Sequence, residues 1–189
     1  MSELSLRQKL LAVNTALDQA KVAHAFGGAI ALAYYAEPRA TIDIDINMFL
    51  PAAEFGKVSG LLAGLGVDTA HDPERLERDG QYRFWWGRTA LDVFLSYVEF
   101  HDAMSKRRRL VPFDGEQIPI LAPEHLLVCK VVFDRRKDWI DIEQMLVAAE
   151  GLGRAEVDHW LDVLVGSGSP QARRFTKLAD RLLSPGHPR

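Results

Sequence analysis

Cysteine is almost absent from this chain of 189 residues, in which Cys129 is the single example. One cysteine excludes an internal disulfide and a cysteine-rich zinc site. Cys129 follows the apolar residues 126–128. That setting indicates a small buried hydrophobe rather than a nucleophile.

Long apolar runs are also missing, since no segment reaches the roughly 20 apolar residues that cross a bilayer. The first residues lack the apolar stretch of a signal peptide, so we expect a cytoplasmic protein with no membrane partner. Nor does one sign of charge dominate, because the formal net charge is −3. This net charge does not indicate a nucleic-acid-binding protein, although a local basic face can coexist with it.

The composition that remains, 48% hydrophobic and 26% charged, is that of an ordinary folded domain. Apolar periodicity and turn residues predict an α+β front part, residues 1–121, and a helical C-terminal part, residues 122–189. In the front part we expect helices over 5–21, 29–36 and 51–65, a strand over 41–47, a hairpin of strands 82–86 and 90–95, and an extended turn-containing segment over 110–120. In the C-terminal part we expect helices over 123–134, 137–150, 154–165 and 170–183.

Polar and β-branched residues alternate strictly along residues 41–47. On a strand this alternation directs Ile42, Ile44 and Ile46 into the core and places Asp43 and Asp45 together on the opposite face. Their Cα atoms would be roughly 6.5–7 Å apart, a separation at which the two carboxylates repel by about 2 kcal/mol. A divalent cation such as Mg²⁺, which prefers oxygen ligands, would relieve that repulsion.

Asp92 supplies a third carboxylate, between apolar neighbours on the second strand of the predicted hairpin. Three strand-borne carboxylates facing one cleft predict a site for two metal ions. One ion would activate an attacking hydroxyl and the other would stabilise a leaving pyrophosphate. The alternative is that Asp43 and Asp45 simply face water on a half-exposed sheet.

Two glycines precede the carboxylate strand, in Phe26-Gly27-Gly28, with fourteen residues between Gly28 and Asp43. This arrangement resembles the signature of the polymerase-β-like nucleotidyltransferase superfamily. Gly27-Gly28-Ala29-Ile30-Ala31-Leu32 and Arg39-Ala40-Thr41-Ile42-Asp43-Ile44-Asp45 resemble in particular the AbiEii and MenT toxins of toxin–antitoxin systems. The resemblance covers roughly residues 24–146. It implies the nucleotidyltransferase fold, a small mixed sheet flanked by helices, with the C-terminal helical bundle completing the active-site cleft.

The resemblance also implies roles for individual residues. Gly27 and Gly28 would hold the triphosphate of a nucleoside triphosphate, with Lys130 and Arg136 as further nucleotide-binding residues. Asp43, Asp45 and Asp92 would bind Mg²⁺, and Asp138 or Asp141 would complete the site. Lys130 could instead be a surface lysine, and Asp138 and Asp141 could merely pair with neighbouring arginines.

The same resemblance implies an acceptor, the 3′ end of transfer RNA, whose modification would block aminoacylation and translation. Such a substrate requires cations beside the cleft. The candidates are Lys106, Arg107, Arg108 and Arg109, with Arg83 and Arg88 near the aromatic pair Trp85 and Trp86. A solvated helix end would equally explain the run 106–109.

A cognate antitoxin from an adjacent gene is a further expected partner. Thr41, close to the expected metal site, is a candidate for regulatory phosphorylation, because a phosphate there would repel the incoming triphosphate. Ordinary β propensity also explains a threonine at this position. Two other functions stay open for the chain: a small-molecule, antibiotic-type nucleotidyltransferase, and a catalytically silent binding module with the same fold.

Overall fold

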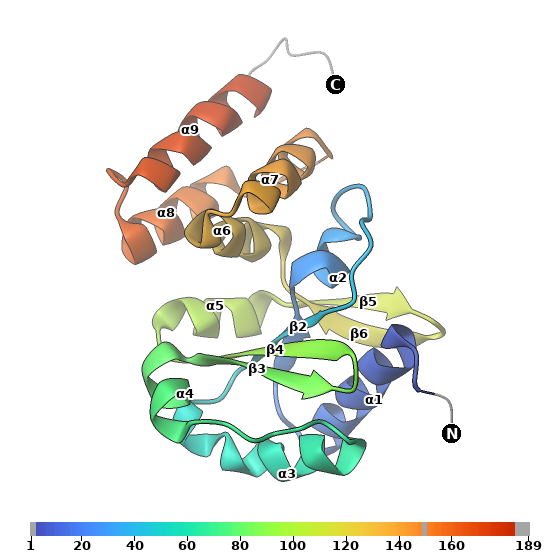
Figure 1. Cartoon of the computed structure of the whole chain (residues 1–189). Helices are drawn as coiled ribbons and strands as arrows, with labels where there is room; N and C mark the ends of the chain where they lie inside the picture. Colours follow the sequence, from blue (N-terminus) through green and yellow to red (C-terminus); the bar gives the residue numbers. More distant parts are fainter. Residues whose placement is uncertain (1–2, 149–150, 184–189) are drawn as a thin grey trace. The chain divides into compact units, whose positions relative to one another are not determined.

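The computed structural model describes residues 3–148 and 151–183 (Figure 1). The chain divides into two compact units, the first made of residues 1–30 and 40–121 and the second of residues 31–39 and 122–189. The last two residues of α2 (Gly28–Leu32) and the loop after it therefore group with the C-terminal helices rather than with the sheet. No helix in the described ranges is long and apolar enough to cross a membrane.

The first unit is built on one six-stranded mixed sheet with the order β3-β4-β2-β1-β6-β5. The strands are β1 (His24–Phe26), β2 (Ile44–Met48), β3 (Gln81–Trp86), β4 (Thr89–Leu95), β5 (Arg109–Phe113) and β6 (Glu116–Ile120). Strand β2 is parallel to β4 and antiparallel to β1, so the carboxylate strand lies inside the sheet. The predicted hairpin β3–β4 is confirmed, and the segment predicted to be extended with a turn over 110–120 forms a second hairpin, β5–β6.

Helices flank this sheet (Figure 1). They are α1 (Leu6–Gln19), the short 3₁₀ helix η1 (Ala52–Glu54), α3 (Gly56–Leu65), α4 (Pro73–Asp79) and α5 (Glu99–Arg107). The N-terminal helix α1 begins at a capping box, in which Ser5 and Gln8 each accept a hydrogen bond from the other's backbone N–H. The predicted helix 51–65 is interrupted, since residue 55 separates η1 from α3.

The two faces of the sheet differ in polarity around β2 and β4. Ile46 lies opposite Val93, and both are fully buried. Phe84, opposite Leu91, stacks on Phe55 with ring centroids 5.2 Å apart. Because side chains alternate along each strand, the acidic residues of β2 and β4 project from the face opposite this apolar core.

The second unit is helical and contains α6 (Pro123–Phe133), α7 (Arg136–Ala148), α8 (Arg154–Val165) and α9 (Pro170–Leu183). Helix α6 contacts the other three, and most of its apolar residues are buried, whereas Val132 and Phe133 at its end are exposed. All four predicted C-terminal helices are confirmed, with residues 149 and 150 of the predicted 137–150 helix outside the described ranges. Together with the mixed sheet they give the expected fold class.

Residues 41–43 are the clearest error in the sequence prediction. Strand β2 begins only at Ile44, and Ile42, expected in the core, is 72% exposed. Pairing with β4 starts at Ile44 and Leu91, so the preceding residues have no partner strand to fix them in alternation. Thr41 and Asp43 therefore lie in the loop that enters the strand.

Candidate active site

A glycine turn joins β1 to α2 beside the carboxylate strand. The backbone N–H of Gly27 donates to the carbonyl oxygen of Asp45 at 2.9 Å. Gly28 has φ +51°, and a Cβ atom on it would lie 1.8 Å from Oδ2 of Asp45. The carboxylate of Asp45 thus packs directly on Gly28, in space that only a glycine leaves open.

Two of the predicted carboxylates are neighbours in the sheet. Asp45 on β2 and Asp92 on β4 are register partners on adjacent parallel strands, which lie about 4.8 Å apart. Asp43 precedes β2 and is held by Thr41. The threonine Oγ1 accepts from the Asp43 N–H at 3.1 Å and donates to the Asp43 carbonyl at 3.2 Å. The structure therefore gathers Asp43, Asp45, Asp92 and the glycine turn at one end of β2.

The guanidinium of Arg83, on β3, lies among these carboxylates. This contact was not predicted from the sequence. The Nε of Arg83 and one terminal nitrogen donate to the two oxygens of Asp92, each at 2.7 Å. The same terminal nitrogen lies 4.0 Å from Oδ2 of Asp43. Hydrogen bonding to Asp92, and then the charges of Asp92, Asp43 and Asp45, raise the pKa of Arg83 above its usual value.

The donor set fits a hard divalent cation only in part. Asp43 and Asp45 supply carboxylate oxygens, the ligands that Mg²⁺ prefers. Asp92, however, gives both oxygens to Arg83. Within residues 3–148 and 151–183 no three His, Cys, Asp or Glu side chains are arranged to hold a metal ion. A three-carboxylate site would require the guanidinium to move, and the predicted two-ion arrangement stays a prediction.

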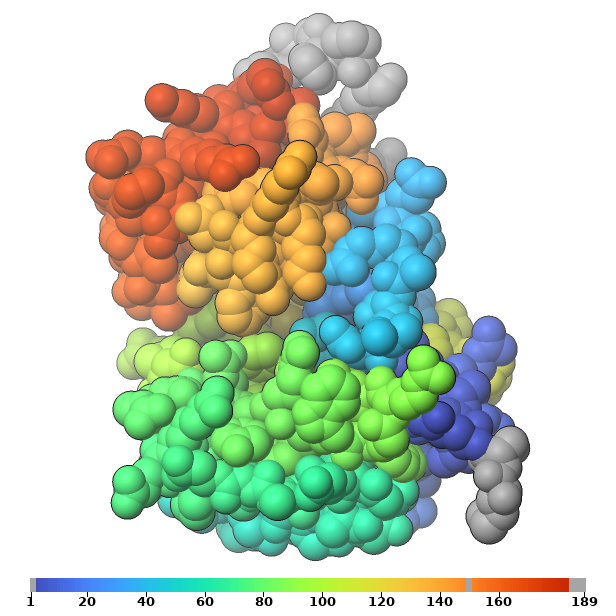
Figure 2. Space-filling model, in the orientation of Figure 1, coloured from blue at the N-terminus to red at the C-terminus, as the bar shows by residue number. Residues whose placement is uncertain are grey.

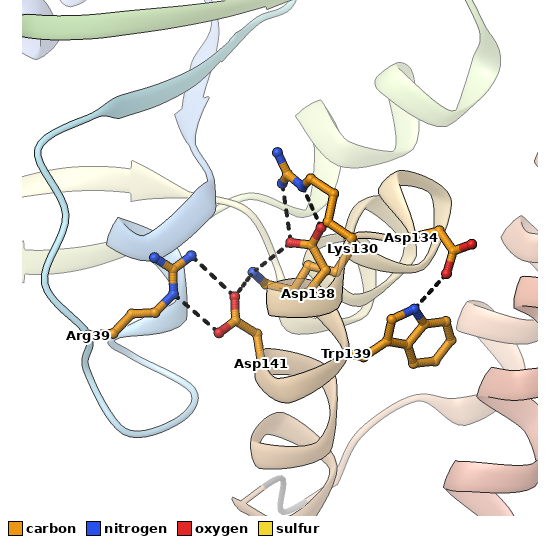
Figure 3. Close-up of polar contacts among 7 residues, drawn as sticks. Arg39, Lys130, Asp134, Asp138, Trp139 and Asp141 are labelled. Atoms are coloured by element: carbon orange, nitrogen blue, oxygen red, sulfur yellow. Dashed lines mark hydrogen bonds and ion pairs between the residues drawn. The ribbon is translucent and has the colours of Figure 1, made fainter.

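The second unit contains a buried ion cluster of its own residues (Figure 3). Lys130 on α6 donates to Asp141 on α7 at 2.6 Å and lies 3.9 Å from Asp138. Arg39 donates to both oxygens of Asp141 at 3.2 and 3.3 Å, and Arg135 binds Asp138 in the same bidentate way. Two carboxylates are thus shared by three cations.

These contacts decide between the alternatives for the C-terminal residues. Lys130 is only 3% exposed, so it is not a surface lysine. Asp138 and Asp141 do pair with arginines, but both are also buried around Lys130. Arg136, the first residue of α7, is exposed. Nucleotide-binding roles for Lys130 and Arg136 stay predictions.

We expect the two partners of this buried pair to respond unequally to mutation. In Lys130→Met, Asp141 keeps Arg39 and Asp138 keeps Arg135, so the free energy of unfolding should fall by no more than about 2 kcal/mol. In Asp141→Asn, Lys130 loses its 2.6 Å partner while buried, which should cost about 3–5 kcal/mol. Urea unfolding of both variants measures the difference. An equal loss of stability would contradict this arrangement.

The basic run lies at the other edge of the sheet from Arg83. Lys106 and Arg107 end α5, and Arg109 begins the edge strand β5. All four residues from 106 to 109 are exposed. Strands β1 and β6 separate β5 from β2, a distance of about 14 Å at the usual strand spacing.

Trp85 and Trp86 lie on opposite faces of β3, as alternation on a strand predicts. Trp86 is buried, whereas Trp85 is half exposed on the same face of β3 as Arg83. The β3–β4 hairpin, drawn in light green, forms part of the visible surface (Figure 2). Trp85 is therefore an accessible aromatic ring two residues from the arginine that binds Asp92.

The architecture of the chain is the nucleotidyltransferase fold. The antibiotic-resistance factor ANT(2″)-Ia aligns over 92% of this chain and 94% of its own, with a TM-score of 0.56 and 15% identity. A second structure of ANT(2″)-Ia, in complex with adenylyl-2″-tobramycin, gives a TM-score of 0.53 at 13% identity over 93% of this chain and 95% of that one. The lincosamide antibiotic adenylyltransferase LnuA, with lincomycin bound, covers 78% of this chain and all of its own, at a TM-score of 0.54 and 15% identity. No protein-family model matches the sequence, and no curated protein gives a significant match.

Proposed function

We propose that the chain is a metal-dependent nucleotidyltransferase that transfers a nucleoside monophosphate from a nucleoside triphosphate to a hydroxyl group. The observation that carries this proposal is the packing of Asp45 on Gly28, with Asp43 two residues earlier and Asp92 in register. This packing brings a glycine turn able to approach phosphates within reach of carboxylates able to hold a cation.

In this proposal each residue has a defined task. The Gly27–Gly28 turn lets the triphosphate approach the backbone closely, while Asp43 and Asp45 hold Mg²⁺. The bound ion would stabilise negative charge on the phosphates and on the leaving pyrophosphate. The acceptor hydroxyl loses its proton to solvent and its oxygen bonds to the α-phosphorus. The bond from that phosphorus to the bridging oxygen breaks, and pyrophosphate leaves with the electron pair. Asp92 is the third carboxylate beside the reacting groups.

For the acceptor we propose the 3′ end of transfer RNA, in the manner of a toxin. The support is the sequence resemblance of residues 27–32 and 39–45, together with the exposed basic run 106–109. A basic patch about 14 Å from the carboxylate strand suits a polymer, whose phosphates extend beyond the reacting nucleotide. Incubation with each labelled nucleoside triphosphate, Mg²⁺ and total transfer RNA tests this directly. Absence of label in RNA with all four nucleotides would exclude an RNA acceptor of this kind.

A small-molecule acceptor is the second candidate. It is favoured by the likeness to ANT(2″)-Ia over nearly the whole of both chains and by the likeness to LnuA. Pyrophosphate release in the presence of a panel of antibiotics, without RNA, separates this candidate from the first. A binding module without catalysis would release no pyrophosphate with either acceptor.

Thr41 offers a means of regulating such a site. Its hydroxyl makes both hydrogen bonds that hold the backbone of Asp43, so a phosphate on this oxygen would break the bond it donates and add about −1.5 to −2 charges beside the metal ligand. We expect co-expression with the product of the adjacent gene to phosphorylate Thr41 and abolish nucleotidyl transfer. Mass spectrometry locates the modification, and Thr41→Val should escape it. Inhibition of Thr41→Val by the same partner would show that silencing occurs elsewhere.

A further inference from the structure

One cation, the guanidinium of Arg83, is shared by the acidic residues of the sheet. It donates two hydrogen bonds of 2.7 Å to Asp92 and lies 4.0 Å from Asp43. It also interacts electrostatically with Asp45. The fork of a guanidinium matches the two oxygens of a carboxylate, which makes such bidentate pairs the strong ones. Arg83 thus offsets part of the negative charge of the side chains to which the proposed function assigns the metal ion.

A divalent ion and this guanidinium exclude each other at Asp92. Both oxygens of that carboxylate already accept a hydrogen bond from Arg83, and each would have to exchange it for a metal–oxygen bond. Two cations within a few ångströms also repel strongly, because the site has only partial access to solvent. Asp92 is 18% exposed and Asp43 35%.

Arg83 is placed so that it can withdraw. Its side chain is 51% exposed, so its charge can move into water without the desolvation that a buried cation suffers. The ring of the half-exposed Trp85 has its centroid 6.0 Å from the guanidinium carbon, within the range of a cation–π contact. β3 is the outermost named strand at this side of the sheet, and beyond it only an isolated bridge from Asp68 to Trp85 is described.

We propose that Arg83 is an internal counter-cation that competes with the divalent metal ion for Asp92 and Asp43, and that the ion enters as the guanidinium withdraws. The inference rests on the proposed function, because it takes these aspartates as metal ligands. In this proposal Arg83 controls the binding of the metal ion to the carboxylates.

Binding of Mn²⁺, measured by electron paramagnetic resonance without nucleotide or acceptor, tests the proposal. Arg83→Gln removes the competing charge and should bind Mn²⁺ about tenfold more tightly than the unaltered protein. Arg88→Gln is the matched control, since it removes the same charge from the β3–β4 turn and should change the affinity less than twofold. Arg83→Lys keeps the charge but not the bidentate geometry of the guanidinium, so its Mn²⁺ affinity should lie between those of Arg83→Gln and Arg88→Gln.

A second measurement uses the unaltered protein and so does not depend on how the variants fold. The Nε–H resonance of Arg83 should report a strong hydrogen bond without metal and should move to a solvent-exposed position as Mg²⁺ saturates the site. A resonance that stays in place at saturation would overturn the proposal. Weaker Mn²⁺ binding by folded Arg83→Gln would do the same, because it would mean that Arg83 supports the site.

Failure of the proposed function gives a different result. The double variant Asp43→Asn, Asp45→Asn should lose Mn²⁺ binding. If it binds as well as the unaltered protein, both the metal site and the counter-cation are wrong. If it loses binding while Arg83→Gln gains none, only the counter-cation is wrong.

Discussion

Asp45→Asn should lower nucleotidyl transfer about a thousandfold or more, the loss expected when a carboxylate that holds a catalytic metal ion becomes a neutral amide. The carboxamide has nearly the same shape as the carboxylate, so the packing against Gly28 and the register with Asp92 should persist. Transfer of labelled nucleotide to RNA, or pyrophosphate release with a small-molecule acceptor, measures the effect. Growth arrest on induction of the gene should disappear in parallel.

Asp102→Asn is the matched control for that experiment, since it removes one exposed carboxylate from α5 in the same unit and should leave transfer unchanged. Asp43→Asn should match Asp45→Asn in effect. A folded Asp45→Asn protein that retains transfer would remove the basis of the enzymatic proposal. If the Asp43→Asn and Asp45→Asn proteins both fold and both still arrest growth, that result would favour a binding function.

Gly28→Ala should be nearly as damaging, although it removes no functional group. The new methyl group would lie 1.8 Å from Oδ2 of Asp45, much closer than any real contact, and φ +51° costs a non-glycine residue about 1–2 kcal/mol. Either the turn or the carboxylate must move. We expect at least a hundredfold loss of transfer, about 2–3 kcal/mol of transition-state stabilisation, and a lower melting temperature.

Gly27→Ala provides the comparison on the adjacent residue. A Cβ atom on Gly27 would meet its nearest neighbours, the side chains of Asn47 and Leu121, at 3.3 and 3.4 Å. Both can yield by a few tenths of an ångström, and Gly27 has no positive φ. Its melting temperature should therefore fall much less than that of Gly28→Ala. Equal loss of stability in the two variants would contradict the packing of Asp45 on Gly28.

Elements with a strong repeating pattern could be predicted from the sequence, and short ones could not. The four C-terminal helices and the β3–β4 hairpin agree with expectation because each has several turns of apolar periodicity or a clear turn. Strand β1 has three residues, too few for alternation to be visible. Helix α4, which is short and strongly charged, was also missed. Of α5 only its basic end was anticipated, as the alternative explanation of the run 106–109.

The candidate site was predicted in composition but not in its contacts. The grouping of Asp45 and Asp92 follows from two strands and a shared polarity, and register confirms that they are neighbours. The pair of Arg83 with Asp92 was missed because the predicted strands 82–86 and 90–95 leave a three-residue link. The structure has a two-residue loop, which places Arg83 opposite Asp92. The contact of Arg39 with Asp141 was missed because 102 positions separate them in the chain and no local pattern reports so distant a partner.

The division of the chain has a practical consequence for anyone who wishes to shorten it. Residues 31–39 group with the helices that begin after residue 121. A fragment ending at 121 would therefore retain residues 31–39 without those helices. Arg39, for example, would lose Asp141. The sheet portion is therefore not a contiguous module. A minimal version is better obtained by replacing residues 31–39 with a short flexible linker than by cutting at the start of α6.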